Sequence, residues 1–228
     1  MPKNIADIRT MAVVLRRTNY GEADRILNLI TPDGKVSAMA RGVRKARSKL
    51  AGGVEMFSLV EMNLHFGKGE LATVTGARMV KYYKAILTDY QCMELMATIL
   101  KKINVAADAA DTAEYFKMTL ECLEGLDAGF NLMLVEGWFL LNLLKASGEE
   151  VNLYRDDKGE KLCADLRYNY DTRESAFSRD ERGKFGADEI KMLRLMVTTP
   201  LEVVARVRGV EMYLPDILWL ARAASKAM

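Results

Sequence analysis

The chain of 228 residues is 50% hydrophobic and 28% charged, so it can bury a sizeable core in one or two domains. Its three cysteines lie far apart and form no CxxC pair, which argues against a disulfide framework and a cysteine-ligated zinc site. The net charge of +2 hides a division, because residues 1–84 carry 15 Lys and Arg against 7 Asp and Glu, a net +8. A basic half joined to an acidic remainder is typical of nucleic-acid contact through the basic half.

The first third of the chain alternates between apolar and polar residues, as half-buried strands do. The clearest case is Val60–Phe66, where one face is apolar and Glu61 and His65 fall on the other. Turn residues separate the strands at Thr31–Gly34 and at Gly67–Gly69. Strands are expected over Met11–Leu15, Arg25–Thr31, Lys35–Val43, Val60–Phe66 and Glu70–Arg78. Five short antiparallel strands indicate a small barrel or sandwich, of which a five-stranded Greek-key barrel is a common form.

The segment Arg41–Lys49 holds five cations and no acid, and it lies between strand-like runs. Such a segment is suited to lie along a phosphate backbone, because each cation that neutralises a phosphate releases a condensed counterion. The alternative is an ordinary solvated loop. The surrounding net charge of +8 favours the first interpretation.

From Tyr82 onward the apolar spacing becomes helical. Helices are expected over residues 87–103, from Asp111-Thr112, over Phe130–Ser147, from Asp188 to Pro200 and from Pro215. The stretch Phe130–Lys145 is too short and too polar to span a membrane, so it predicts a buried helix. Met1–Arg9 is polar with no apolar core behind it, so we expect no signal peptide and a cytoplasmic protein. Val151–Gly186 is polar, and within it Arg167–Asp171 and Ala176–Ser178 are compatible with a short hairpin.

No pattern of residues predicts catalysis. The only histidine, His65, lies in the middle of a strand, and the chain has no GxxxxGK[ST], GxGxxG or HExxH motif. We therefore expect a protein that is not an enzyme and has no cofactor. Two tyrosines, Tyr20 and Tyr82, remain open as base-stacking surfaces, whereas Phe57 and Phe66 are expected in the core.

The basic β half carries motifs that resemble the N-terminal domain of the bacterial recombination mediator RecO family. The motifs are Tyr20–Arg25, Leu29–Thr31 with Gly34–Val36, Ala40–Arg44, Ser48–Gly52 and Glu55–Ser58. Their order and spacing over residues 11–78 carry the resemblance, whereas the helical remainder is similar in pattern and length only.

The resemblance implies an α+β protein, with a five-stranded OB-type β-barrel over residues 1–80 and an all-α domain over residues 81–228. It implies binding of single- and double-stranded DNA, annealing of complementary strands, and loading of RecA onto SSB-coated strands together with RecR. The family's DNA surface is basic and lies largely on the OB domain. The matching positions are Arg25, Lys35, Arg41, Arg44, Lys45, Arg47 and Lys49, and charge alone adds Arg16 and Arg17.

One departure from the family concerns zinc. Many members carry a four-cysteine zinc module in the helical domain, but the corresponding stretch, residues 151–186, has only Cys163. We therefore expect no metal there. The helical domain is expected to dock the acidic C-terminal tail of SSB through cations near apolar faces, with Lys101, Lys102, Arg194, Arg206 and Arg208 as candidates. An OB-fold RNA-binding protein of translation or RNA processing is the alternative function.

Overall fold

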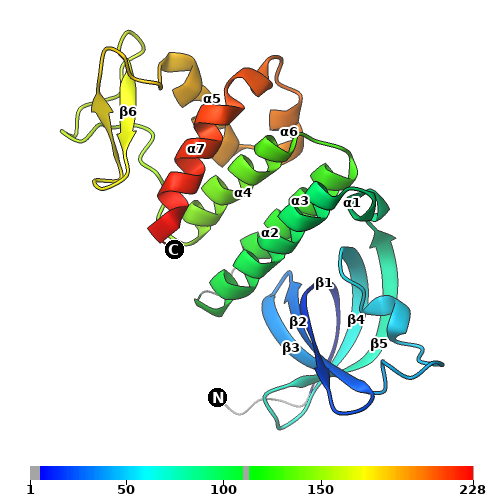
Figure 1. Cartoon of the computed structure of the whole chain (residues 1–228). Helices are drawn as coiled ribbons and strands as arrows, with labels where there is room; N and C mark the ends of the chain where they lie inside the picture. The colour runs from blue at the N-terminus through cyan, green and yellow to red at the C-terminus, as the bar shows by residue number, and fades with distance from the viewer. Residues whose placement is uncertain (1–5, 110–112, 228) are drawn as a thin grey trace. The chain divides into compact units, whose positions relative to one another are not determined.

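The computed structural model describes residues 6–109 and 113–227. It consists of two compact units, Met1–Asp127 and Ala128–Met228 (Figure 1). The first unit contains a β-barrel and three helices. The second contains the remaining helices and a small two-stranded sheet. The division by packing therefore falls at residue 127, whereas the change from strand to helix falls near residue 82.

The first unit is built on a closed five-stranded barrel. Its strands are β1 (Ala6–Tyr20), β2 (Asp24–Thr31), β3 (Gly34–Ala40), β4 (Ser58–Phe66) and β5 (Ala72–Tyr82), in the order β1-β2-β3-β5-β4. All neighbours are antiparallel except β3 and β5, which pair in parallel at Ala38 with Ala72 and at Met39 with Thr73. The expectation of antiparallel strands throughout was wrong at this one seam. The barrel is of the OB type, and the helical region that follows it makes the chain α+β as predicted.

Apolar residues at alternate positions fill the barrel, as a pleat with a repeat of two residues requires. The core includes Leu27 and Leu29 of β2, Ala38 of β3 and Met62 of β4. Val43 and Val54, from the connection between β3 and β4, close one end of this core. Gly53 lies so close to β5 that an added Cβ would come within 2.4 Å of the Ala77 Cβ. A side chain at position 53 would therefore push the connection off the barrel.

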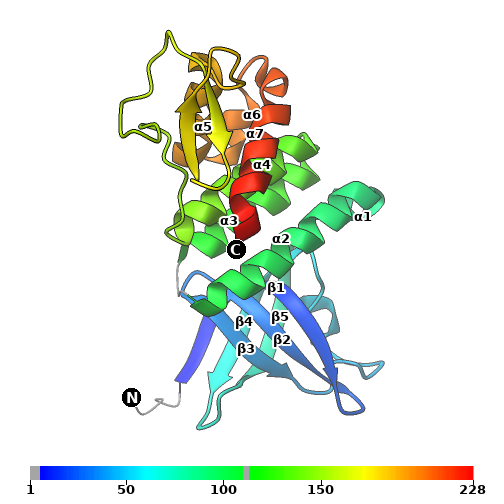
Figure 2. The same ribbon diagram turned by 60° about the vertical axis from the view of Figure 1, so that its left-hand side comes forward.

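Two helices, α2 (Tyr90–Ala109) and α3 (Ala113–Asp127), pack on the outside of the first three strands, and Figure 2 shows α2 running across the barrel. The short helix α1 (Lys84–Thr88) packs against α2 and α3. Val13 and Ile30 pair across β1 and β2 and are fully buried although neither belongs to the barrel core. The predicted start of a helix at Asp111-Thr112 lies outside the described residues.

The second unit is organised around α4 (Leu132–Ala146), which is buried almost all round as its sequence predicted. It packs against α5 (Ala187–Thr198), α6 (Leu201–Ala205) and α7 (Leu214–Ala224). The indole Nε1 of Trp138 donates to the carbonyl of Thr199 at 3.0 Å, and the amide of Asn142 donates to the carbonyl of Met196 at 2.9 Å. Both bonds satisfy the open C-terminal end of α5, where Pro200 stops the helix.

The polar segment 151–186 has its own small apolar core. It contains the hairpin β6 (Tyr168–Asp171) and β7 (Ala176–Arg179) that the sequence indicated. Phe177 is fully buried, and its ring meets those of Tyr168, Tyr170 and Phe185 edge-on at centroid distances of 6.5, 5.4 and 5.5 Å. Edge-to-face contacts add to the free energy that burial of the rings provides.

A buried carboxylate fixes the loop beside this cluster. Asp156 accepts hydrogen bonds from the backbone N–H groups of Lys158 and Glu160 and from the guanidinium of Arg179. Burial alone would raise the pKa of Asp156, but these donors outweigh it and hold the pKa below its ordinary value.

The segment does not offer the ligands of a zinc module. Its one cysteine, Cys163, is exposed, and no group of three or more His, Cys, Asp or Glu side chains that could hold a metal occurs among the described residues. The four thiolates of the family's module therefore do not fit this chain. In the described part of the chain, no helix is both long and apolar enough to cross a membrane.

Replacing Phe177 with alanine should destabilise the segment 151–186, because it removes the ring that the other three contact. Loss of a fully buried phenylalanine costs about 3–5 kcal/mol. Limited proteolysis should then cut within residues 151–186 well before the rest of the chain. Glu174→Ala, in the exposed turn of the same hairpin, is the control and should change stability by less than about 0.5 kcal/mol.

Purified protein should contain no stoichiometric zinc, since one thiol cannot make a structural site. Elemental analysis before and after treatment with a chelator measures this directly. One zinc per chain that survives the chelator would show that the cysteine argument fails.

Candidate nucleic-acid interface

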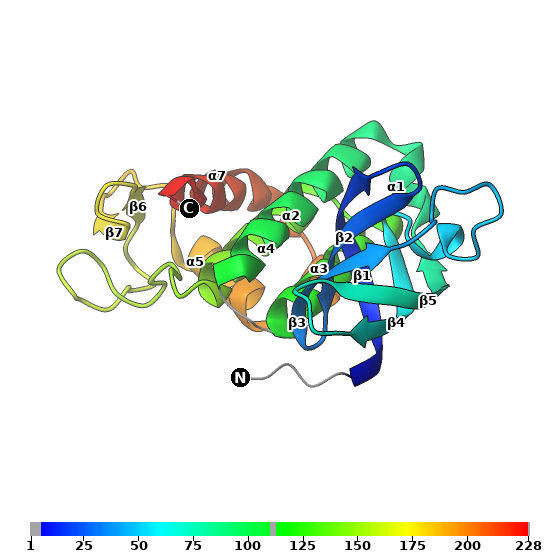
Figure 3. The same ribbon diagram turned by 90° about the horizontal axis from the view of Figure 1, so that it is seen from below.

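The segment Arg41–Lys49, here called the basic loop, is held against the β1–β2 turn by its backbone. The N–H of Arg44 donates to the carbonyl of Ala23 at 2.9 Å, and the N–H of Gly42 donates to Asp24 Oδ1 at 2.7 Å. Gly42 has φ of +62°, a left-handed conformation that glycine adopts without strain. The chain thereby leaves β3 and folds back onto the turn. Figures 1 and 3 show the light-blue segment after β3 projecting from the barrel.

The loop is anchored by one apolar residue and exposes its charges. Val43 is buried in the barrel core. Two further turns follow, where Lys45 N–H donates to Gly42 O and Ser48 N–H donates to Lys45 O. All five cations are exposed, namely Arg41, Arg44, Lys45, Arg47 and Lys49. None of the five forms a salt bridge within the described residues.

The three candidate arginines of the β1–β2 hairpin differ in their surroundings. Arg16 is exposed on β1, and Arg25 donates through Nε to Asn19 Oδ1 at 3.2 Å. Neither forms a salt bridge with a described residue. Arg17 does, because its Nη1 lies 2.8 Å from Glu55 Oε2, in the connection between β3 and β4.

Lys35 is placed away from the loop. Its Nζ donates to the Asn104 carbonyl and to Asp108 Oδ1 on α2, each at 2.6 Å, and its side chain is 9% exposed. Asn28 of β2 donates to the side-chain oxygen of Asn104 at 2.9 Å beside it. Lys35 thus fastens α2 to the barrel, and we leave it out of the candidate surface. Nothing local in the sequence pairs Lys35 with Asp108.

The candidate surface is therefore a group of exposed or half-exposed cations without an acidic partner in the described structure. We call it the basic rim, and its members are Arg16, Arg25, Arg41, Arg44, Lys45, Arg47 and Lys49. The nearby acids are partly engaged, since Asp24 accepts from Gly42 and Glu55 pairs with Arg17.

Several other cations of the barrel are neutralised. Glu61 pairs with both Arg9 and Arg78, at 2.7 and 3.1 Å, and the hydrogen bond from Arg9 lowers the pKa of this carboxyl below its usual range. Lys81 lies 3.5 Å from Glu124, and His65 Nδ1 lies 2.8 Å from Asp7. Lys68 is a further exposed cation without a salt bridge in the described structure, but the basic rim is the larger group of uncompensated cations on the barrel.

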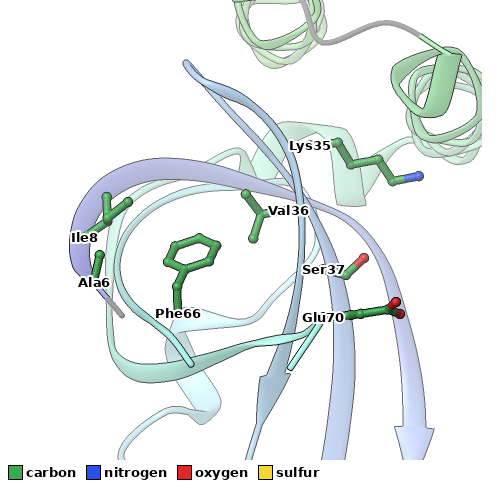
Figure 4. Close-up of a pocket in the computed structure, with 7 residues that line it drawn as sticks. All are labelled: Ala6, Ile8, Lys35, Val36, Ser37, Phe66 and Glu70. Carbon is green, nitrogen blue, oxygen red and sulfur yellow. The ribbon is translucent and has the colours of Figure 1, made fainter. Parts of the chain in front are cut away.

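The helices cover one part of the barrel surface, which limits where an oligonucleotide could bind. OB folds commonly bind oligonucleotides on the face of strands 2 and 3 and on adjacent loops. Here the contacts of Asn28 and Lys35 with α2 cover part of that face. At the end of the barrel away from the basic loop, a cavity of about 330 Å³ has apolar walls that include Ile8, Val36 and Phe66 (Figure 4). Lys35 also lines this cavity, but its ammonium points away in Figure 4 and is engaged by Asn104 and Asp108.

Comparison with known proteins connects these features to a family. A family model described as the N-terminal part of recombination protein O matches residues 5–83. A protein of Dehalococcoides mccartyi strain CBDB1 named DNA repair protein RecO is 33% identical over 180 residues, which cover 71% of this chain and 70% of that protein. A protein of the same name from Roseiflexus sp. strain RS-1 is 28% identical over 221 residues, covering 88% of this chain and 73% of that one.

Replacing Lys35 with methionine should lower stability while leaving affinity for DNA within about twofold of wild type. The variant keeps the aliphatic stem but loses two charge-assisted hydrogen bonds, which are worth roughly 1.5–3 kcal/mol each at most. Thermal unfolding and a fluorescence anisotropy titration measure the two effects. Lys45→Met is the matched comparison, and it should weaken DNA binding while leaving stability unchanged. Weaker DNA binding by K35M at unchanged stability would return Lys35 to the candidate surface.

Proposed function

The chain belongs to the RecO family of DNA repair proteins, and we propose that it acts as a recombination mediator that binds DNA through the basic rim. Its role in DNA repair and recombination follows from the family. The finer activities proposed for it are binding of single- and double-stranded DNA, annealing of complementary strands, and loading of RecA onto SSB-coated strands with RecR. These activities place the protein in the cytoplasm at the nucleoid.

The observation that carries this proposal is the exposure of the basic rim without acidic partners. A cation already paired to a carboxylate gains little from a phosphate, because one ion pair is exchanged for another. The unpaired cations of the rim make new pairs and release counterions from the DNA. If all seven engage a single strand, log affinity should fall against log salt with a slope near −5, at about −0.7 for each neutralised phosphate.

Annealing by such a surface requires no covalent step. Two complementary strands repel each other through their phosphates, and a cationic surface reduces that repulsion while base pairing supplies the driving force. The described residues around His65 fit this account, since its ring contacts Asp7 and neither side chain is buried. We therefore propose that the protein is not an enzyme.

We propose that the domain over residues 1–80 binds DNA and that the acidic region over residues 81–228 docks partner proteins, among them RecR and the SSB tail. Two of the cations considered for the tail are engaged within the unit. Arg194 donates to the Leu153 carbonyl and stacks on Tyr154, and Arg206 pairs with Glu202. Arg208 is exposed and lies close in sequence to Met212, a residue that is 79% exposed, so Arg208 is the stronger candidate in this unit. In the first unit, Lys101 and Lys102 of α2 remain candidates for binding the SSB tail.

Removing the charge of Arg44, Lys45 and Arg47 together should weaken binding to DNA and slow annealing without unfolding the protein. Substitutions at exposed loop positions usually change stability by less than about 0.5 kcal/mol each. The salt slope should become shallower by roughly 2, for three lost phosphate contacts. Titrations at several salt concentrations and an annealing assay with SSB-coated oligonucleotides measure these effects.

The matched control removes three exposed cations elsewhere in the first unit, Lys68, Lys84 and Lys117, so the net charge changes by the same amount. It should bind and anneal like wild type. Equal loss in both triple variants would mean that net charge, and not the basic rim, determines affinity. Stronger binding to RNA than to DNA in a competition assay would instead favour the alternative function in RNA processing.

A further inference from the structure

The β1–β2 hairpin extends beyond the rest of the barrel. β1 pairs with β4 only as far as Val13, opposite Leu59, but it pairs with β2 as far as Tyr20, opposite Asp24. Over residues 16–20, β1 therefore has β2 as its one neighbour in the described pairing. Its other edge does not join the sheet.

The two faces of this hairpin arm have different surroundings. Arg17 is opposite Leu27, a core residue, so Arg17 lies on the inner face. Side chains alternate between faces along a strand, so Arg16, Thr18 and Tyr20 share the outer face. All three are exposed. We call these three residues the outer row.

The outer row begins where the helices stop covering the barrel. Arg16 is opposite Asn28, and the amide of Asn28 is the group that contacts Asn104 of α2. Beyond it, Thr18 and Tyr20 continue along the same face toward the turn. The outer row therefore lies on the part of this face that α2 leaves uncovered. OB folds commonly bind single strands on this face.

Tyr20 is the exposed aromatic residue of the outer row. The residue is 56% exposed, and no hydrogen bond to its hydroxyl group is found among the described residues. The next residue, Gly21, accepts a hydrogen bond through its carbonyl from Arg44 Nη1 at 3.2 Å. A guanidinium of the basic loop thus contacts the backbone of the residue that follows Tyr20. Aromatic faces beside a cationic groove are the combination by which single-strand binders hold successive bases.

We propose that Tyr20 is a base-stacking platform that makes the basic rim prefer single-stranded over double-stranded DNA, a proposal that rests on the DNA-binding function above. An unpaired base lies on the ring, and the flanking phosphates meet Arg16 and Arg44. In a duplex the faces of the bases are already stacked on one another and are not available to the ring. Duplex DNA therefore uses the cations of the rim but gains nothing from Tyr20.

The test compares Tyr20→Ala and Tyr20→Phe in the full-length chain by anisotropy titration with a labelled oligonucleotide and its duplex. Tyr20→Ala should weaken single-strand binding about tenfold, within the range measured for base–aromatic stacking. It should change duplex binding by less than twofold. Tyr20→Phe keeps the ring and should bind both like wild type. The salt slope should not change in either variant, because a neutral side chain releases no counterion.

Tyr90→Ala is the matched control, since Tyr90 is also a tyrosine of the first unit and is 70% exposed, at the start of α2. It should leave both affinities unchanged. If Tyr20→Ala binds single strands like wild type, or loses equal affinity for both forms, the stacking role is overturned. In either case a weakened R44A/K45A/R47A variant would still support the proposed function. Absence of DNA binding by the wild-type protein would overturn the function itself.

Discussion

The hydrogen bonds from Lys35 Nζ to Asn104 and Asp108 determine which surface of the barrel is open. Lys35 and Asn28 project from the outer face of β2 and β3, and both contact the same turn of α2. An ammonium that is almost fully removed from water is stable only when its hydrogen bonds are satisfied, so α2 must stay close to the barrel. Detaching the helix would leave Val13 and Ile30 exposed as well. The turn and the basic loop remain uncovered, and they are the surface that we propose for DNA.

The basic loop stays available because its backbone and the buried Val43 side chain hold most of it in place, so its cations are not needed as ion-pair partners. Its anchors are the contacts of Gly42 and Arg44 with the β1–β2 turn and the burial of Val43. A fixed backbone lowers the entropy that must be lost when the loop meets a ligand. Arg44 donates to the Gly21 carbonyl, and the other exposed cations of the loop can follow phosphates of different spacing, which suits binding that does not depend on sequence. Elsewhere on the barrel, as at Glu61 with Arg9 and Arg78, the charges compensate each other.

Local patterns in the sequence predicted much of the fold and part of the candidate site. The alternation of Val60–Phe66 identified β4 to within two residues, and the absence of acids identified the basic loop. The sequence did not show that β1 continues through Arg16–Tyr20, because polar residues there occupy both faces of a hairpin arm that leaves the core. It also grouped Lys35 with the loop. The partner of Lys35 lies 73 residues away, and only the register of β3 against α2 brings them together.

The segment 151–186 shows how a chain that lacks a metal site can still order a polar insertion. A structural zinc stabilises a small fold because the binding free energy is also folding free energy. Here burial of Phe177 among three other rings provides apolar contact, and Asp156 satisfies the backbone of the adjoining loop. Metal ligation depends on the deprotonation of thiols and on redox state, whereas a ring cluster depends on neither. The aromatic core should therefore keep this part of the helical unit ordered under oxidising conditions that would release a thiolate-bound metal.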